Sequence, residues 1–416
     1  MAPIEAQRPD IAMIAPYPSP GSPTTSGVAW YSQNLARALA DEGATVTVVA
    51  PSNDPGSPSE LDGRVRVRRC FAKGPAGLMR ASVAALRSGA RVTHVQHEAF
   101  LFGGPEAVPG LIGGLARLRR AGTGPVVTMH QVVRPGQVDK SFTELHRVSM
   151  PAPLARAGLS TLQQSIGRIA RRTIVHERAF ARHVPGSVVL PVGSIRSAAA
   201  DPALRQGHEV SGQSDGRPSA LRAQYGIEPD EFVVLCFGFV APYKGLEAAL
   251  SAAEIAGHPV RLVVAGGEHP RLSGQGYLDG LEERFGATAT FTGYVPEPDV
   301  SRWFRAADAV LLAYPTAFSS SGVLALALEY GVPALLSPPL AEMTGLPPGM
   351  STPLEPGLLA QRLESLAKRG TELAEVERWS AGLAEGRSWP EVARRHLEIY
   401  EEVTDAKRSA SRGHRA

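Results

Sequence analysis

Short apolar runs rich in β-branched residues alternate with longer amphipathic stretches along most of the chain. Such alternation is typical of βαβ units, because strands of a parallel sheet are buried on both faces whereas each crossover helix buries one side. It occurs twice, so we predict an α/β protein with two doubly wound, Rossmann-like sheets. The expected strands are Ile11 to Ala15, Thr45 to Ala50, Val65 to Cys70, Val92 to Gln96, Val126 to Met129, Thr173 to Val175, Val188 to Leu190, Phe232 to Phe237, Arg261 to Ala265, Thr288 to Phe291, Ala309 to Leu312 and Ala334 to Leu336.

A segment without periodicity separates the two halves. From Ser194 to Pro218 the chain is rich in Ser, Ala, Gly and Gln, which is typical of a linker. We expect a first domain over residues 1–195, a linker over residues 196–228, a second domain over residues 229–388, a last helix over residues 389–405 and a disordered tail over residues 406–416. One face of the last helix, which packs on its own domain or on the other one, is formed by Trp389, Val392, Leu397, Tyr400 and Val403.

The totals agree with this organisation. A chain of 416 residues exceeds the size of a single hydrophobic core, and 43% hydrophobic with 20% charged residues is ordinary for a soluble enzyme. The opening MAPIEAQRPD lacks an apolar core of signal-peptide length, and the apolar stretch around residues 100–118 is interrupted by Glu106 and two prolines. We therefore expect a cytoplasmic protein. Cys70 and Cys236 lie in apolar runs, which favours small buried side chains over a disulfide or a metal ligand.

The charge pattern says little about partners. The formal net charge is +3 and the two signs are mixed along the chain, which argues against a nucleic-acid binder. Residues 110–122 combine apolar surface with Arg117, Arg119 and Arg120. A weak contact with an anionic membrane surface is one interpretation, and a packed helix with a solvated basic end is the favoured one. A monomer or a homodimer fits equally well.

Two segments of the second half suggest an anion site. Ligands of open parallel sheets bind beyond the carboxyl ends of the strands, so the loops after strands are the places to search. Lys244 follows one strand and precedes a helix, where an amine can meet phosphate oxygens; a solvated loop lysine is the alternative. Ser319, Ser320, Ser321 and Gly322 follow another strand and open an apolar helix. Small residues and free N–H groups there favour an anion, and a serine N-cap alone is the other interpretation.

Two further loops of the second half follow strands. One contains Gly267 and Glu268, and the other contains Tyr294 and Val295. A close glycine, an aromatic face and open backbone groups are suited to a base and a ribose, although plain turns would look the same.

The first half places polar residues at similar positions. Gly27 ends a small-residue segment that opens a helix, His97 and Glu98 end one strand, and His130 and Gln131 end another. Histidines are more often structural, but a strand end facing a cleft raises the odds of a functional role for His130. The motifs G-x-G-x-x-G, G-x-x-x-x-G-K-[ST], C-x-x-C, H-E-x-x-H and D-x-D do not occur, so we expect no metal site and no cofactor.

Read together, these segments resemble retaining glycosyltransferases of family 4, which have the GT-B fold of two facing Rossmann-like domains with an interdomain cleft. The resemblance covers nearly the whole chain, in the expected order. It rests on SGVAWYSQNLARALADEGATVTVVAP, VTHVQHEAFLFGG, VVTMHQV, FGFVAPYKGLE, AGGEHP, FTGYVPEPDVSRWFRAADAVLLAY, SSSGVLALALEYGVPALLS and SWPEVARRHLEIYEEV.

The resemblance implies a role for each site. Lys244 and the amides of Ser320 to Gly322 would hold the diphosphate of a nucleotide-sugar donor of UDP, GDP or TDP type. Tyr294 and Val295 would lie at the nucleobase, Gly27 would let its loop approach donor and acceptor, and His130 would touch the transferred sugar. His97, Glu98 and Gln131 are the remaining candidates on the acceptor side. The last helix would return to the first domain, and a hydroxyl acceptor would receive the sugar with retention and without a metal.

Two positions depart from the family pattern. Many members have Arg where this chain has Phe239, and many have a ribose-binding Glu where this chain has Leu326. Glu329 is not its equivalent, because three residues along a helix rotate the side chain by about 300°. The motifs resemble a branch that lacks this Glu, so we interpret the change as a subfamily feature. A catalytically silent partner subunit that binds nucleotide sugar and a sugar-nucleotide epimerase of the same fold are the alternatives.

Overall fold

The computed structural model describes residues 10–19, 27–52, 59–145, 148–194, 219–269, 274, 276–347 and 349–413. The chain forms two compact units. Unit 1 contains Met1–Gly193, Phe318–Ser320 and Trp389–Ala416, and unit 2 contains Ser194–Ala317 and Ser321–Ser388. Each unit is an α/β layer structure around a largely parallel sheet, which confirms the predicted fold class. None of the described helices is long and apolar enough to span a membrane.

Unit 1 contains an eight-stranded sheet in the order β3-β4-β2-β1-β5-β6-β7-β8. All neighbouring strands are parallel except β3 and β4. The strands are β1 (Ile11–Ile14), β2 (Val46–Pro51), β3 (Glu60–Asp62), β4 (Val65–Phe71), β5 (Val92–His97), β6 (Val126–Met129), β7 (Arg172–Val175) and β8 (Val188–Val189).

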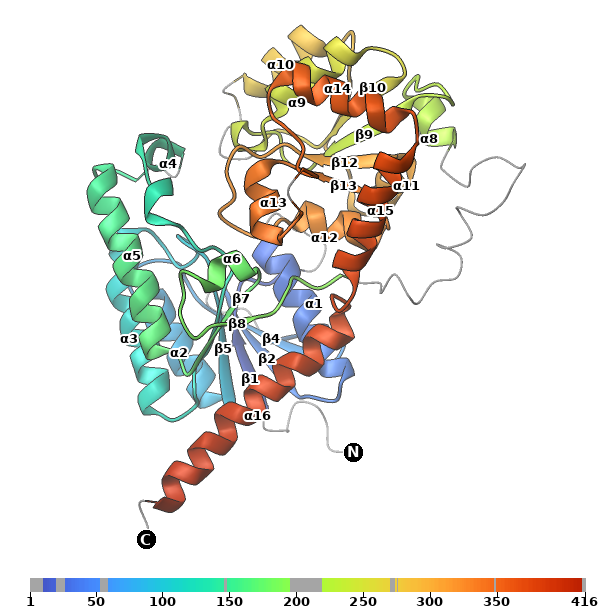
Figure 1. Ribbon diagram of the computed structural model, residues 1–416. Helices are drawn as coiled ribbons and strands as arrows, with labels where there is room; N and C mark the ends of the chain where they lie inside the picture. The colour runs from blue at the N-terminus through green and yellow to red at the C-terminus, as the bar shows by residue number, and fades with distance from the viewer. Residues whose placement is uncertain are drawn as a thin grey trace. The chain divides into compact units, whose positions relative to one another are not determined.

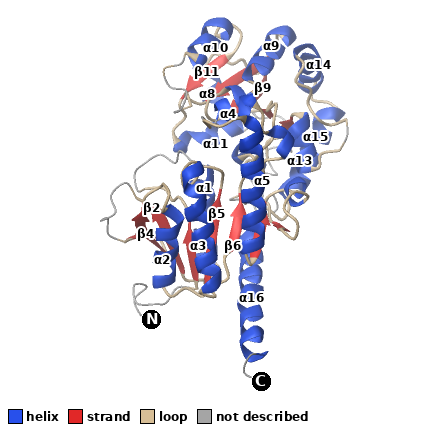
Figure 2. Ribbon diagram, turned by 90° about the vertical axis from the view of Figure 1, so that its left-hand side faces the viewer, coloured by secondary structure: helices blue, strands red, loops and turns tan. Residues whose placement is uncertain are grey.

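Helices cover both faces of this sheet. In Figure 1, α2, α3 and α5 lie on one side of the strands and α1 and α16 on the other. Figure 2 shows α2, α3 and α5 in front of the sheet. The elements are α1 (Gly27–Asp41), α2 (Gly77–Arg87), η2 (Pro105–Ala107), α3 (Val108–Arg120), η3 (Pro135–Gln137), α4 (Lys140–Leu145), α5 (Ala152–Ile169), α6 (Arg178–Ala181) and α16 (Trp389–Gly413).

Helix α1 is amphipathic and is one of the elements against which α16 packs. Tyr31, Leu35 and Leu39 recur at helical spacing and are buried, and Gly43 ends the helix region at a φ of 94° that favours glycine. Helix α16 packs against α1 and β5, so the last helix lies in unit 1, as the resemblance implies.

Unit 2 contains a five-stranded parallel sheet in the order β11-β10-β9-β12-β13. Helices α9, α10 and α14 cover one face and α11, α12 and α15 lie on the other (Figure 1). The elements are α8 (Ser219–Gln224), β9 (Phe232–Phe237), η5 (Pro242–Lys244), α9 (Leu246–Ala256), β10 (Val260–Ala265), α10 (Tyr277–Phe285), β11 (Thr290–Gly293), α11 (Glu297–Ala306), β12 (Ala309–Leu312), α12 (Gly322–Glu329), β13 (Ala334–Leu336), α13 (Pro338–Thr344), α14 (Pro356–Ala367) and α15 (Thr371–Ala384).

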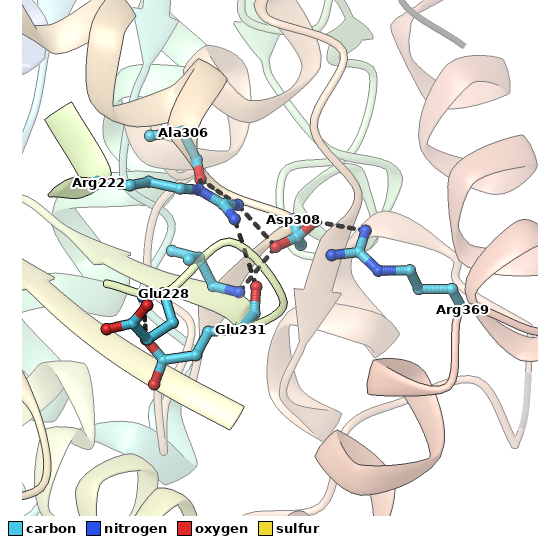
Figure 3. A network of polar contacts seen from close by, with 7 residues as sticks. Arg222, Glu228, Glu231, Ala306, Asp308 and Arg369 are labelled. Carbon is cyan, nitrogen blue, oxygen red and sulfur yellow. Dashed lines mark hydrogen bonds and ion pairs between the residues drawn. The ribbon is translucent and has the colours of Figure 1, made fainter. Parts of the chain in front are cut away.

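A buried ion-pair network ties unit 2 together at the amino ends of β9 and β12 (Figure 3). The Asp308 carboxylate accepts hydrogen bonds from Arg222 at 2.8 Å, from the backbone N–H of Val233 at 2.8 Å and from Arg369 at 2.8 Å. Arg222 also donates to the Ala306 carbonyl at 2.7 Å and 2.9 Å. The network therefore lies at the opposite strand ends from those expected to bind ligand.

Arg222 also changes the extent of the predicted linker. Helix α8 lies inside the expected linker, yet Leu221 and Arg222 are buried in unit 2. Unit 2 thus includes α8, because the guanidinium supplies hydrogen bonds to backbone carbonyls of the sheet region. Residues 195–218, the remainder of the linker prediction, are outside the described residues.

Other boundaries differ from expectation by local effects. Strand β3 was not expected from its short polar sequence; its Asp62 accepts hydrogen bonds from Tyr17 at 2.7 Å and Arg37 at 2.7 Å, which hold it beside β4. Strand β11 begins at Thr290 and not at Thr288, whose N–H closes the turn after α10. Helix α16 continues to Gly413, beyond the expected end at residue 405.

The two cysteines and the basic helix are explained by packing. Cys236 is buried, Cys70 is half-buried, and both are free thiols. In α3, Leu111, Leu115 and Leu118 are buried, whereas Arg117, Arg119 and Arg120 are exposed. Arg119 donates to the Ile169 carbonyl at 2.8 Å at the end of α5.

Candidate active site

Lys244 lies at the carboxyl end of the sheet of unit 2. Its side chain is 7% exposed, and its ammonium donates to the Phe237 carbonyl at 2.7 Å and lies 5.4 Å from the centre of the Tyr314 ring. Burial lowers the pKa of the Lys244 amine below its usual range. A desolvated amine with a single backbone acceptor gains charge stabilisation from an anion placed beside it.

Tyr314 links Lys244 to the start of α12. Burial raises the pKa of Tyr314 to about 12, and a hydrogen bond with Ser321 opposes that rise. The hydroxyl of Ser321 accepts from the N–H of Leu324 at 3.3 Å and so caps α12. Tyr314 and Ser321 therefore connect the Lys244 amine to the first turn of α12 within unit 2.

Glycines make this strand end unusually close-packed. A Cβ at Gly238 would lie 2.9 Å from the Lys244 ammonium, and a Cβ at Gly266 would lie 2.2 Å from the Gly238 carbonyl oxygen. Gly245 has a φ of 66°, and a Cβ there would lie 2.1 Å from the Ala313 carbonyl oxygen. Larger residues at these positions would displace the backbone that holds Lys244.

The expected nucleobase loops lie at neighbouring strand ends of the same sheet. Gly267 accepts at its carbonyl from the N–H of Val240 at 2.9 Å, and a Cβ at Gly267 would lie 3.3 Å from the Cβ of Tyr294. Tyr294 is 59% exposed and Val295 is buried. Glu268 accepts from the N–H of Gly274 at 3.1 Å. The structure thus places the Gly267 and Tyr294 loops in contact.

The serine turn is divided between the units. Phe318–Ser320 belong to unit 1, where Gln131 and Ser319 form a β-bridge and the Ser320 hydroxyl donates to the Glu177 carboxylate at 3.0 Å. Ser321 and Gly322 belong to unit 2. Gly27 is the first residue of α1, and the rest of its predicted loop, residues 20–26, is outside the described residues.

Polar pairs in unit 1 follow three adjacent strands. His97 and Glu98 end β5, His130 and Gln131 follow β6, and a third pair formed by residues 176 and 177 follows β7. Except for the half-buried Glu98, all of these side chains are at most 9% exposed. The structure therefore brings the predicted acceptor-side residues to one edge of the first sheet.

Hydrogen bonds engage both ring nitrogens of His130. Nδ1 of His176 donates to the Leu190 carbonyl at 2.8 Å. Nε2 of His130 donates to Oε1 of Gln96 at 2.8 Å, and Nδ1 of His130 lies 3.1 Å from Nε2 of His176. Burial first, and then the charges of neighbouring histidines, hold the pKa of His130 well below its usual range, so the ring is neutral.

Three residues join the candidate set only through the structure. Tyr314 is within reach of Lys244, Glu177 accepts from Ser320, and His176 orients His130. The sequence carried a signal for the last two, because His176 and Glu177 directly follow a predicted strand, as the other two polar pairs do. Tyr314 had no signal of its own beyond its place after β12.

Comparison with known proteins decides the family. The family described as Glycosyl transferase 4-like domain matches residues 26–238, which is just over half of the 416-residue chain. The chain belongs to this glycosyltransferase family. It is 27% identical over 402 residues to the D-inositol 3-phosphate glycosyltransferase of Segniliparus rotundus, covering 91% of the chain and 81% of that protein. It is 32% identical over 212 residues to the enzyme of that name from Rhodococcus erythropolis, covering 47% of the chain but only 46% of that protein.

Solved structures of glycosyltransferases show the same GT-B fold. Sucrose-phosphate synthase from Thermosynechococcus elongatus matches with a TM-score of 0.68 at 19% identity, covering 95% of this chain and 99% of that chain. Anabaena HepE in complex with UDP-glucose matches with a TM-score of 0.64 at 16% identity, covering 94% of this chain and 99% of that chain. At these identities the likeness concerns the fold of the glycosyltransferase, not its substrates.

Proposed function

We propose that this glycosyltransferase moves a sugar from a nucleoside-diphosphate sugar to a hydroxyl acceptor. The observation that supports this most directly is the group formed by Lys244, Tyr314 and Ser321 at the carboxyl end of the sheet in unit 2. The presence of UDP-glucose in the HepE structure of the same fold agrees with a nucleotide-sugar donor. Unit 2 then binds the donor, and unit 1 supplies the acceptor side.

The diphosphate is the leaving group, so negative charge develops on it in the transition state. The buried Lys244 amine and the first amides of α12 would stabilise that charge, because both are fixed in place before the charge develops. The roles of Ser319, Ser320 and Gly27 in binding the diphosphate rest on the family resemblance alone. In this proposal these groups supply the electrophilic stabilisation, without a divalent metal.

Retention of the anomeric configuration is part of the proposal. In the front-face route that the family resemblance implies, the leaving phosphate accepts the proton of the acceptor hydroxyl, so no protein carboxylate has to act as nucleophile. Glu98 and Gln131 remain candidates for orienting the acceptor. His130 remains the candidate to touch the transferred sugar, and one of its ring nitrogens has to exchange its present partner to do so.

The two departures suggest how the donor is held. Phe239 packs edge-on against His269, with ring centres 5.5 Å apart, in the place where many relatives carry an arginine. The side chain of Leu326, which is half-buried in α12, has no carboxylate that could bind a ribose. We propose that Gly267, Glu268, Tyr294 and Val295 hold the base and ribose instead.

Binding of nucleoside diphosphates tests the proposal. We expect at least one of UDP, GDP, TDP and ADP to raise the melting temperature of the wild-type protein, since a ligand that binds only the folded state stabilises it. Lys244→Ala should retain the fold, lose most of this shift and lower sugar transfer at least tenfold. Lys368→Ala, which removes an exposed lysine of unit 2, is the matched control.

The outcomes separate the alternatives. Wild-type transfer by Lys244→Ala would remove the phosphate role of Lys244. Diphosphate binding without transfer, across a panel of donors and acceptors, would favour a silent partner subunit. Full transfer in the presence of EDTA supports the metal-free part of the proposal, and the anomeric signal of the product in NMR tests retention.

A further inference from the structure

A cavity of about 260 Å³ lies within unit 1 beside the carboxyl end of β5. Its walls come from the loop after β5, from α3, from α5 and from Val148 and Met150. The lining is almost entirely apolar and includes Phe102, Leu111 and Leu159. The ionisable residues among the lining side chains are His97 and Glu98, and none of the lining residues is a lysine or arginine.

The size and lining of this cavity select the kind of group that fits. An engineered apolar cavity of about 150 Å³ binds benzene. A cavity of about 260 Å³ suits a somewhat larger apolar group, such as a fused bicyclic ring or a short branched alkyl chain. A phosphate or a sugar ring is a poor occupant, because its polar groups would leave water without regaining hydrogen bonds.

His97 is the one histidine among the lining residues of this cavity. The side chain is 6% exposed, and its Nδ1 has no hydrogen-bond partner among the described residues. Burial lowers the pKa of His97 to about 4, so the ring is neutral near pH 7 and each nitrogen is either a donor or an acceptor. The His97 ring therefore adds no positive charge to the cavity wall.

The loop that forms one wall is held in a fixed shape. Phe100 has a φ of 68°, which is strained for an aromatic residue, and the N–H of Leu101 donates to the Glu98 carbonyl at 3.1 Å. The Phe102 carbonyl accepts from the N–H of Gly74 at 2.8 Å. The loop that forms this wall of the cavity therefore has a strained conformation that backbone hydrogen bonds hold in place.

We propose that this cavity binds the apolar part of the sugar acceptor, a hydroxyl-bearing small molecule whose ring or branched alkyl group fills the space. The proposal rests on the proposed function and names the acceptor class for it: an amphiphilic alcohol or phenol. The position agrees with it, since ligands of parallel sheets bind beyond the carboxyl ends of the strands.

Two glycines of α5 allow a matched test. Gly158 lines the cavity and Gly167 does not, and a Cβ at either would meet no atom within 4 Å. Gly158→Phe should fill the cavity, whereas Gly167→Phe adds the same side chain to the same helix outside it. The probes are 2-naphthol and 1-octanol, whose binding is measured by calorimetry, with glycerol as the polar comparison.

We expect the wild-type protein to bind at least one of the two apolar probes and to bind glycerol at least tenfold more weakly. Gly158→Phe should lower the affinity for that probe at least tenfold, and Gly167→Phe should change the affinity less than twofold. The proposal is overturned if neither probe binds the wild type, as when a segment of the chain fills the cavity, or if both glycine variants bind alike.

Donor binding separates this proposal from the proposed function. Gly158→Phe should keep the nucleoside-diphosphate affinity of the wild type, because the cavity is in unit 1 and Lys244 is in unit 2. If all variants bind the diphosphate and none of the proteins binds an apolar probe, only the proposed acceptor class is overturned. Absence of diphosphate binding in the wild type, with apolar probes still bound, would overturn the proposed function and leave the cavity as an apolar binding site.

Discussion

Lys244 is held away from water and donates to one backbone carbonyl, at 2.7 Å. Burial lowers the pKa of this amine below its usual range. A bound diphosphate would raise that pKa again by placing negative charge beside the amine. The buried position therefore makes the charge of this single side chain depend on ligand and on pH.

A pH dependence of donor binding follows. As the pH rises through the lowered pKa of Lys244, the amine loses its proton and its attraction for phosphate. The affinity for nucleoside diphosphates should therefore decline at a lower pH than it would for a lysine of ordinary pKa. We expect Lys244→Met to bind more weakly and to show no such fall. Calorimetry between pH 7.5 and pH 10 measures both, and an equal decline in wild type and variant would contradict the role of Lys244.

His396 shows how one residue alters the pattern of the last helix. It is fully buried, its Nδ1 lies 2.7 Å from the Val392 carbonyl and its Nε2 lies 3.4 Å from the Tyr31 hydroxyl. The predicted apolar face included Leu397, which is half-buried. The fully buried His396 beside it adds a polar contact between α16 and α1 that periodicity does not reveal.

At the scale of elements, the ends of strands carry both binding and stability. The carboxyl ends of β9 and β12 hold Lys244 and precede α12, whereas their amino ends hold the Asp308 network (Figure 3). A change at one end should therefore leave the other end largely unaffected.

Removal of the central carboxylate tests this separation. Asp308→Ala leaves Arg222, which is 5% exposed, without its charged partner, and losing one member of a buried pair costs about 3–5 kcal/mol. We expect that loss in urea unfolding of unit 2, with diphosphate affinity retained by the folded fraction. Asp299→Ala is the matched control, since its partner Arg302 is half exposed and an exposed pair contributes about 0–1 kcal/mol. Equal losses of unfolding free energy in both variants would contradict the stabilising role of Asp308.

At the scale of the whole molecule, unit 1 is assembled from three separate parts of the chain. Phe318–Ser320 and α16 join the first 193 residues, and unit 1 contains several buried histidines. Burial lowers the pKa of His97 and His396 to about 4 and lowers those of His94 and His130 well below the usual range.

Stability should consequently fall in mild acid. An unfolded chain protonates these histidines near pH 6.5 while the folded chain does not, so stability is complete above that pH and declines as the pH falls toward 4. A group with a folded pKa of about 4 loses about 3 kcal/mol over that window. We expect His396→Gln to flatten the decline of the melting temperature, and His183→Gln, which changes an exposed side chain, to leave it unaltered. An identical pH profile in both variants would contradict this account.

The sequence by itself determined the two largely parallel sheets, the place of nearly every strand and, to within a residue, the helix starts near Gly27, Gly245 and Gly322. These features depend on residues near one another in the chain, since apolar runs, helical spacing and small residues at turns act locally. For the same reason it predicted polar residues at strand ends, including Lys244 and His130.

Only the tertiary structure decided which side chains meet. Tyr314 beside Lys244, Ser320 on Glu177 and His396 on Tyr31 join residues distant in sequence, and nothing in either local segment specifies the partner. The apolar cavity beside His97 likewise exists because three distant segments leave a space between them. Contacts of this kind depend on packing, which is fixed by the shape of the whole fold and not by the periodicity of one element.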